Sequence, residues 1–415
     1  MRSGAALLAF ALLFLPGAAA GQALSDTLGL GGSLRAGYWS SSRMLDDRRS
    51  IPTAAVWLDA APGLGPNGSL RLDGWIGRQS AESGLDGRLR EGYLRFSAGP
   101  LDLRIGQQVI AWGRADRINP TDYLGPRDFT RLLPDDDDQR LGTPALKATY
   151  YLRSVAVTAI ILPYFTPNEI PLPVPPRPLA YQNVRPDRGF RQVALKLEQT
   201  GGAIDGSLSY FSGFDPSPDL ALDQTHVPFP RLRLEHHRLQ VVGADAATTV
   251  GRFGLRAEAA YTWTEDPQGN RPEIKNPFLF LVAGGDRTFF ETLNLNLQYV
   301  LIAVTNYRAP DAVPDPFVRG VAVQEVILSN QLDRRRQGMT ARISNRWLHE
   351  TLEAEVAGVV FFPRRDYALR PKLRYAFTDR WTVIVGGDLF RGREPSMFGF
   401  LERNSTVYAE LRRGF

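Results

Sequence analysis

Cationic side chains recur at every second position of several apolar segments, a spacing whose chemistry is the binding of anions. Arg370, Lys372 and Arg374 alternate with Leu369 and Leu373. Alternate side chains of an extended strand share one face, so the three cations point to the same side. Arginines that outnumber carboxylates at a constriction focus positive potential there and favour anions. The pattern therefore predicts a weakly anion-favouring surface.

A set of candidate pore-lining and constriction residues follows from period-two facing and from the polar loop after residue 112. They are Arg71, Arg95, Arg104, Gln108, Arg114, Asp116, Arg117, Asp122, Lys147, Arg256, Arg342, Arg346, Arg370, Lys372 and Arg374. Carboxylates expected on the same inner face are Asp73, Glu91, Asp102, Glu258, Glu353, Glu355 and Glu410. Two interpretations stay open: a ladder of ion pairs that stiffens the wall, or a positive constriction that selects anions. The net charge of +5 is too small to decide between them.

Four consecutive carboxylates, residues 135–138, stand in the same polar loop. They could chelate Ca²⁺, but their spacing lacks the alternating ligands and the glycine of a calcium loop. We expect instead a solvated acidic tip, or a partner for Arg127, Arg131 and Arg140 within the loop. The sequence therefore predicts no metal site and no cofactor.

Catalysis is disfavoured by the scarcity of acid-base groups. The four histidines are His226, His236, His237 and His349, and none lies beside a G-x-S-x-G serine motif. The absence of cysteine excludes thiolate nucleophiles, thiolate metal sites and disulfides. We therefore predict that the protein is not an enzyme. A hydrolase, and a binding, adhesion or structural barrel without transport, are kept as alternatives.

A secretory leader is predicted at the N-terminus. Arg2 supplies the positive charge, residues 5–15 are apolar, and residues 18–20 offer an A-x-A cleavage site. Eleven apolar residues are too few to span a bilayer, which needs about 20. We expect residues 1–20 to be a signal peptide, with cleavage before Gly21 or alternatively near Ala23, and residues 21–415 to form one domain.

That domain is predicted to be all-β, an antiparallel transmembrane barrel of about 18 strands. The expected strands are residues 28–41, 52–62, 69–80, 88–98, 101–112, 143–152, 154–164, 188–200, 203–214, 232–249, 252–265, 277–287, 289–305, 331–347, 350–362, 366–378, 381–391 and 403–415. Apolar and polar residues alternate along them, as in a wall with lipid outside and water inside. A soluble sandwich also alternates. Aromatic residues near strand ends decide between the two, because girdles at both interfaces demand them: Tyr38, Trp39, Trp112, Trp263, Trp347, Phe361, Trp381 and Phe415.

The connections between these strands alternate in length. Tight turns are expected at residues 62–68, 98–101, 152–154, 200–203, 250–251, 285–287, 348–350 and 378–381, and long irregular loops at 113–142, 165–187, 215–231, 266–276, 306–330 and 392–402. Residues 317–330 could hold a short helix or an extra hairpin. Short turns on the periplasmic side and long loops outside the cell are typical of bacterial barrels, so both termini should be periplasmic.

The terminal strand supports closure of the barrel. Residues 406–415 alternate apolar and polar side chains and end on Phe415. A strand at the chain end needs pairing on both edges, which a closed barrel provides. We expect Phe415 to lie in an aromatic girdle and to be the contact for the barrel assembly machinery.

The loop at residues 113–142 is the candidate for narrowing the pore. An 18-stranded barrel leaves a water-filled passage unless something fills it, and only about seven residues separate the leader from residue 28, too few for a plug domain. Gly106 and Gly113 permit a bend, and Asn119, Pro120 and Asp122 set up a tight polar turn.

About 40 residues here resemble a group of proteobacterial outer-membrane barrels, mostly uncharacterised and similar in style to the alginate-export porins. The pattern is a strand R-x-G-x-Q-x-V-x-W-G followed by N-P-x-D, with isoleucine in place of the valine. The matching residues are Arg104, Gly106, Gln108, Ile110, Trp112, Gly113, Asn119, Pro120 and Asp122. The resemblance implies passage of solutes and, for the alginate exporters, a basic lumen that conducts a polyanion outward.

Together these observations predict a porin-like channel in the Gram-negative outer membrane that lets small or polyanionic solutes pass. The expected partners are outer-membrane lipid, lipopolysaccharide, the assembly machinery and the solutes, with no nucleic acid.

Overall fold

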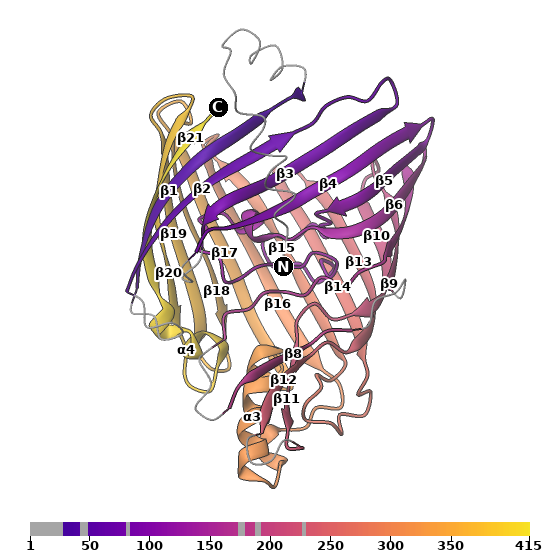
Figure 1. The fold of residues 1–415 in the computed structure, drawn as a ribbon, viewed down its shortest axis with the longest axis vertical. Helices are drawn as coiled ribbons and strands as arrows, with labels where there is room; N and C mark the ends of the chain where they lie inside the picture. Colours follow the sequence, from indigo (N-terminus) through magenta and orange to yellow (C-terminus); the bar gives the residue numbers. More distant parts are fainter. Residues whose placement is uncertain (1–27, 42–48, 80–83, 173–178, 187–191, 226–229) are drawn as a thin grey trace.

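The chain forms a closed barrel in the computed structural model, which describes residues 28–41, 49–79, 84–172, 179–186, 192–225 and 230–415. Eighteen strands pair antiparallel with their neighbours in the chain order of the barrel, and the last strand pairs with the first (Figure 1). The predicted fold class and the strand number of 18 are confirmed. The predicted signal peptide lies outside the described residues.

The barrel strands are β1 (Gly31–Ser41), β2 (Ser50–Ala60), β3 (Gly68–Arg78), β4 (Asp86–Ala98), β5 (Leu101–Gln108), β6 (Thr143–Leu152), β7 (Val155–Leu162), β9 (Gln192–Gln199), β10 (Asp205–Phe214), β13 (Arg238–Val250), β14 (Phe253–Thr264), β15 (Phe278–Phe289), β16 (Leu293–Val304), β17 (Arg335–Trp347), β18 (Leu352–Phe361), β19 (Asp366–Ala376), β20 (Trp381–Arg391) and β21 (Thr406–Gly414). Each of the 18 predicted segments overlaps one of them.

The barrel wall is apolar outside and polar inside, the reverse of a soluble protein. Leu297, Ile343 and Val407 are 51%, 50% and 60% exposed, whereas Gln298 and Glu258 are each 1% exposed. Because side chains alternate along a strand, each strand presents both kinds of residue to opposite faces. The alternation predicted from the sequence therefore describes the two surfaces of one wall.

Closure depends on the chain end, as the terminal pattern predicts. β21 pairs with β20 on one edge and with β1 on the other. Beyond the strand, the Phe415 amide donates to the Gly32 carbonyl at 3.1 Å, and the Gly32 amide donates back at 3.2 Å. No edge of the β1–β21 seam is left open, which satisfies the backbone groups of both strands.

The short turns gather at the barrel end that carries the C-terminus, and α3 and the longer connections lie at the other end (Figure 1). One predicted turn is wrong. Residues 285–287 remain in β15, which continues to Phe289, and the chain turns at Phe290 and Glu291, both with positive φ. Asp286 is polar, as turn residues often are, but it faces Arg256 of the neighbouring strand and forms an ion pair with it.

A small second layer, the cap, extends the barrel at the long-loop end. It consists of β8 (Tyr181–Val184), β11 (Asp219–Asp223), β12 (Arg231–Glu235) and α3 (Pro316–Leu328), which packs on β11. Asp315 caps α3 by accepting from the amides of Phe317 and Val318 at 2.8 and 3.0 Å. The helix alternative for residues 317–330 is therefore correct.

Two of the expected irregular loops, 165–187 and 215–231, contain the cap strands β8 and β11. The single strand expected at 232–249 is wrong as well. It divides at His236 and His237 into β12, which pairs in the cap, and β13, which pairs in the barrel. Both parts alternate apolar and polar residues, so local pattern could not reveal the change of sheet.

Three of the predicted girdle aromatics lie inside the barrel. Trp39, Trp112 and Phe361 are buried, whereas Tyr38, Trp263, Trp347 and Phe415 are exposed. Trp39 and Tyr38 are adjacent in one strand and cannot share a face. No helix among the described residues is long and apolar enough to cross a membrane.

Candidate functional site

The segment that joins β5 to β6 crosses the inside of the barrel (Figure 1). We call residues 113–142 the inner loop. The strand before it ends at Gln108 and not at Trp112 as predicted. After Gln108, side chains instead of a neighbouring strand accept the backbone hydrogen bonds: the Val109 amide donates to Glu91 at 3.3 Å and the Trp112 amide to Asp122 at 3.1 Å. The chain therefore leaves the wall four residues early and turns inward.

Apolar side chains attach the inner loop to the wall on several sides. Trp112 and Leu124 pack with Ile160, Phe211 and Val241 in one buried cluster. Leu133 packs with Trp57 and Trp75 in another cluster, and Leu132 packs beside Trp39 and Tyr408 in a third. These contacts remove apolar surface from a hydrated lumen and hold the loop in one position.

The first bend of the loop is held by a carboxylate of the wall. Glu258 on β14 accepts from the amides of Arg114 and Ala115, and from the Thr121 hydroxyl at 3.0 Å. Gly113 has φ +99°, and a Cβ there would lie 2.9 Å from the same carboxylate. Glycine is needed at this position, in agreement with the bend predicted at Gly113.

From this bend, residues 114–117 contact further strands of the wall. Arg114 pairs with Asp245 on β13 at 2.6 Å, whereas Asp116 pairs with Arg342 on β17 at 2.6 Å. Arg117 pairs with Glu355 on β18 at 2.5 Å. Leu133 packs on Trp57 of β2, which lies nine strands around the barrel from Glu258 on β14, so the inner loop bridges the lumen.

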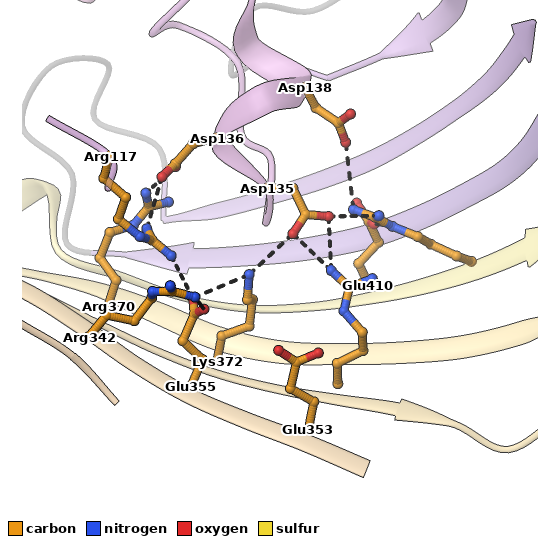
Figure 2. Close-up of polar contacts among 12 residues, drawn as sticks. Arg117, Asp135, Asp136, Asp138, Arg342, Glu353, Glu355, Arg370, Lys372 and Glu410 are labelled. Atoms are coloured by element: carbon orange, nitrogen blue, oxygen red, sulfur yellow. Dashed lines mark hydrogen bonds and ion pairs between the residues drawn. The ribbon is translucent and has the colours of Figure 1, made fainter. Parts of the chain in front are cut away.

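The acid run, residues 135–138, ends this bridge on the wall formed by β19, β21 and β1 (Figure 2). Asp135 accepts from Arg374 at 2.8 Å, from Arg412 at 2.8 Å and from Lys372 at 3.2 Å. The expectation of a solvated acidic tip is wrong for three of the four residues. Their partners are distant in sequence, and local charge pattern carries no information about them.

The remaining contacts of the acid run follow the same scheme. Asp136 pairs with Arg370 and, at 2.8 Å, with Arg117, while Asp138 pairs with Arg35. Asp137 alone has an exposed side chain, and it pairs with Arg140 inside the loop at 3.1 Å. The predicted pairing with loop arginines is therefore correct for this residue.

Charge pairing controls the ionisation of the acid run. Burial opposes the charged form of Asp135, but Arg412, Arg374 and Lys372 outweigh it and lower the pKa of that carboxyl. Burial is likewise outweighed for Asp136, whose pKa is lowered by Arg370 and Arg117. Both side chains stay ionised well into the acid range.

A second contact between the inner loop and the wall joins a charged side chain to aromatic rings. The Arg131 guanidinium lies 4.2 Å from the ring centre of Trp75 and 5.2 Å from that of Trp57. Burial, with repulsion from neighbouring arginines, lowers the pKa of Arg131 to about 9. The cation and the two rings clamp the loop beside the acid run.

A polar cavity of about 370 Å³ lies between the inner loop and the wall. Its lining includes Arg117, Arg342, Lys372, Asp116 and Asp135. Four of these five residues belong to the predicted pore-lining set. The cavity is the hydrated space that this arrangement leaves beside the bridge.

The predicted site residues divide into two groups in the structure. One group forms or contacts the inner loop: Arg114, Asp116, Arg117, Asp122, Arg256, Arg342, Arg370, Lys372 and Arg374. In the other, Arg71, Arg95, Arg104 and Arg346 pair with wall carboxylates, Gln108 donates to the Ala145 carbonyl, and Lys147 stands across from the like-charged Arg104. The ion-pair ladder that stiffens the wall fits the four arginines of this second group, and the roles of all these residues in conduction stay predictions.

Sequence reasoning missed Arg35 and Arg412, and it named Arg131 only as a partner for the acid run within the loop. Arg412 alternates with Glu410, which was placed on the inner face, so period two contained the signal for it. Arg35 lies between Leu34 and Ala36, so period two places its side chain on the face opposite to theirs. The position of Arg131 depends on a loop conformation and left no such signal.

The cap contains a second group of charged side chains, the cap cluster, which is more deeply buried than the lumen site. Lys275 pairs with Asp215 at 2.7 Å and with Asp219 at 3.3 Å. His237 Nδ1 lies 2.7 Å from Asp219. Glu325 of α3 is fully buried, accepts from the Leu220 amide and interacts electrostatically with Asp219.

Protons are shared within the cap cluster. Burial and then the charge of Asp219 raise the pKa of Glu325 well above its usual value. Burial lowers the pKa of His237, but Asp219 outweighs it and the net shift is upward. For Asp219 burial is outweighed by Lys275 and His237, so its pKa is lowered. Glu325 is thus the protonated member.

The two histidines of the cap form structural contacts. His237 contacts Asp219, and His236 Nδ1 lies 2.8 Å from the Asp215 carbonyl oxygen, so both have partners where the sequence assured none. His226 lies outside the described residues. Among the described residues no group of three or more histidine, aspartate or glutamate side chains has the geometry of a metal site, the acid run included.

Comparison with known proteins finds likeness in fold only. No family model matches the sequence, and no curated protein matches it. Among solved structures, the outer membrane protein opdK from Pseudomonas aeruginosa is similar over 93% of this chain and 98% of that one, with 11% identity and a TM-score of 0.57. Acinetobacter baumannii OccAB4 is similar over 93% and 97%, with 9% identity and a TM-score of 0.55. The chain therefore has the fold of outer-membrane porins.

Proposed function

We propose that the protein is a passive channel of the Gram-negative outer membrane, in which the inner loop forms the constriction. The observation that carries this proposal is a loop bridging β14 and β2, on opposite sides of an 18-stranded barrel, with a polar cavity beside it. A barrel of this size is wide enough for an aqueous passage, and a loop across it limits the size of the solute.

The membrane location is supported by the outer surface. Apolar side chains such as Leu297 and Ile343 face outward along the strands, while buried polar residues face the lumen. Lipid and lipopolysaccharide would cover that surface, and the exposed Phe415 at the short-turn end would be read by the barrel assembly machinery. In this proposal residues 1–20 are a cleaved signal peptide, residues 21–415 are the mature barrel, and the short turns are periplasmic.

Small anionic solutes are the proposed permeants, with a weak preference over cations. Support comes from the basic wall residues near the constriction, of which Arg342 and Lys372 line the cavity. Carboxylates of the inner loop neutralise much of this charge, so the preference should be small. Outward passage of a polyanion, which the alginate-exporter resemblance implies, is included in the proposal. A catalytic role is not.

The test is conductance of the purified protein in planar bilayers. We expect steady channels whose reversal potential in a salt gradient indicates a slight excess of anion flow. Deletion of residues 114–140 should increase the conductance several-fold, because the bridge is removed while the 18 strands remain. Absence of channels, or a reversal potential that favours cations, would contradict the proposal.

A further inference from the structure

A row of five basic side chains on the barrel wall holds the acid run as a receptor holds a ligand. We propose that this row, the cation track, is a binding site for soluble linear polycarboxylates and that the acid run is its tethered occupant. The track consists of Arg35, Arg370, Lys372, Arg374 and Arg412. This proposal rests on the channel function, because the site lies in the lumen that solutes would cross.

The contacts of the track have the chemistry of carboxylate recognition. Asp135 accepts from three of its cations, and Asp136 and Asp138 each pair with another. Guanidinium groups present planar donors that match carboxylate oxygens, and hydrogen bonds between charged partners are stronger than neutral ones. Apart from the Ser33 hydroxyl, which accepts from Arg35 at 3.0 Å, the side-chain acceptors of these donors among the described residues are carboxylates, so carboxylates define the class of ligand.

The spacing of the track suits a linear chain of carboxylates. Arg370, Lys372 and Arg374 project from one face of β19 at intervals of about 7 Å. The acid run follows this row as the short 3₁₀ turn η1 (Asp136–Gln139), in which side chains three residues apart point the same way. Asp138 is three residues after Asp135, and both approach Arg412, at 3.8 and 2.8 Å. An acidic peptide or another flexible polycarboxylate can reproduce these positions.

The wall neutralises only part of the track. Arg370, Lys372 and Arg412 also pair with carboxylates of the wall, which are Asp388, Glu355 and Glu410. Among the described residues, Arg35 and Arg374 form ion pairs only with Asp138 and Asp135. The Nη2 atom of Arg412 is buried without a hydrogen-bond partner. Removing the acid run would take from Arg35 and Arg374 their ion pairs and leave the track with an excess of cations over wall carboxylates, which favours replacement by another anion.

The track is accessible from the lumen. Lys372 contributes to the track and also lines the 370 Å³ cavity, together with Arg117 and Arg342. A soluble carboxylate that enters this cavity meets the middle of the track first. It then competes with the acid run for the same donors.

Tethering gives the acid run an advantage in this competition. A segment linked to its site acts at an effective concentration on the order of millimolar. A soluble polycarboxylate should therefore bind the intact protein weakly and bind a variant without the acidic side chains much more tightly. This difference is the measurable consequence of the proposal.

The experiment titrates the detergent-solubilised full chain with an end-blocked tetra-aspartate peptide by calorimetry. The variants are wild type and Asp135→Asn/Asp136→Asn/Asp138→Asn. We expect the peptide to bind the triple variant at least tenfold more tightly than wild type, and a tetra-asparagine peptide to bind neither. Adding Lys372→Gln and Arg374→Gln to the triple variant should abolish the gain.

Asp137→Asn is the matched control, because it removes the same charge from an exposed neighbour that does not touch the track. It should leave the peptide affinity within about twofold of wild type. Circular dichroism reports whether each variant folds, and Asp135→Asn alone, which vacates three donors, replaces the triple variant if that one does not fold.

Equal peptide affinity in wild type and the Asp135 variants would overturn the proposal, as would tight binding of tetra-asparagine. Bilayer recordings of the same proteins separate this result from the channel function. Conduction without a gain in peptide binding refutes the track alone, whereas binding without conduction in any variant refutes the channel and not the site.

Discussion

The protein contains two groups of paired charges that differ in their exposure to water: the acid run with the cation track, and the cap cluster. In the lumen, the acid run meets the cation track as a set of ion pairs that water and solutes can reach. In the cap cluster, Lys275, Asp215, Asp219 and Glu325 are enclosed between α3 and the cap strands, and one carboxyl stays protonated.

The difference shows how hydration sets the response of an ionic contact. Partly hydrated pairs are screened by salt and can exchange partners, because either ion recovers water when it separates. A dry cluster cannot exchange partners at low cost, since an unpaired charge would remain in a medium of low dielectric constant. The charge of such a cluster changes instead when one of its members gains or loses a proton. The lumen site is therefore suited to competition by anions, and the cap cluster to structural attachment of α3.

The largest effect is expected from removing the lysine of the cap cluster. Lys275→Met leaves Asp215 and Asp219 without their buried partner, which should destabilise the cap by about 3–5 kcal/mol. Hydrogen exchange of the α3 amides at pH 6 measures this loss. Arg346→Met, in an exposed pair with Glu350, is the control and should change stability by less than about 1 kcal/mol. Unchanged protection of α3 would mean that the cap cluster does not hold it.

A smaller effect is expected at the bend of the inner loop. Glu258→Ala removes the acceptor of two backbone amides and of the Thr121 hydroxyl, at a cost of about 2–3 kcal/mol. The inner loop should then be cleaved faster by protease in detergent, and channel currents should become noisier. Glu353→Gln changes another wall carboxylate, whose one ion pair among the described residues is with Arg346 at 3.9 Å, and should leave cleavage unchanged.

The two regions should respond to pH in opposite directions. The raised pKa values of Glu325 and His237 mean that their stabilising contribution is complete below the ordinary values of 4.5 and 6.5 and is lost as the pH rises through the raised ones. The lowered pKa values of Asp135 and Asp136 mean the reverse: their contribution is complete above 3.8 and is lost as the pH falls through the lowered values.

Hydrogen exchange, corrected for its intrinsic pH dependence, checks this contrast. Between pH 6 and pH 9 we expect roughly tenfold loss of protection in α3 and little change in the acid run, and toward pH 3 loss in the acid run instead, with a tenfold change corresponding to about 1.4 kcal/mol. Glu325→Gln should reduce the alkaline response of α3. Parallel loss of protection in both regions would contradict the assignment of protons.

The smallest effect is expected from salt. Raising NaCl from about 0.1 to 1 M shortens the screening length from about 10 to 3 Å. Protection of the acid run should fall two- to threefold, whereas α3 should be unaffected because its charges are enclosed. A stronger response in α3 than in the acid run would reverse the comparison.

The barrel itself was largely predictable from local pattern. Leu295 and Leu297 alternate with Asn296 and Gln298 in β16, and this alternation is sufficient to orient the strand because the period of a strand is two. The early bend was predictable too, since Gly113 occupies a backbone conformation that favours glycine. Strand ends were less certain, because side chains such as Glu91 take over ladder hydrogen bonds after β5.

The partners inside the lumen were not predictable. Asp135 and Arg374 are 239 residues apart, and nothing in either segment indicates the other. Inward aromatics such as Trp39 resemble girdle residues in sequence, since both lie near strand ends. The cap was missed because β12 and β13 share one alternating pattern but belong to different sheets.

Sequence alone therefore determined the existence of the barrel strands, the two faces of the wall and the closure of the ring, because these depend on side-chain alternation and on the unpaired edges of neighbouring strands. Tertiary structure decided which charges meet across the lumen and which carboxyl keeps its proton in the cap. Those outcomes depend on distance and hydration between segments far apart in the chain, and only the closed barrel brings such segments together.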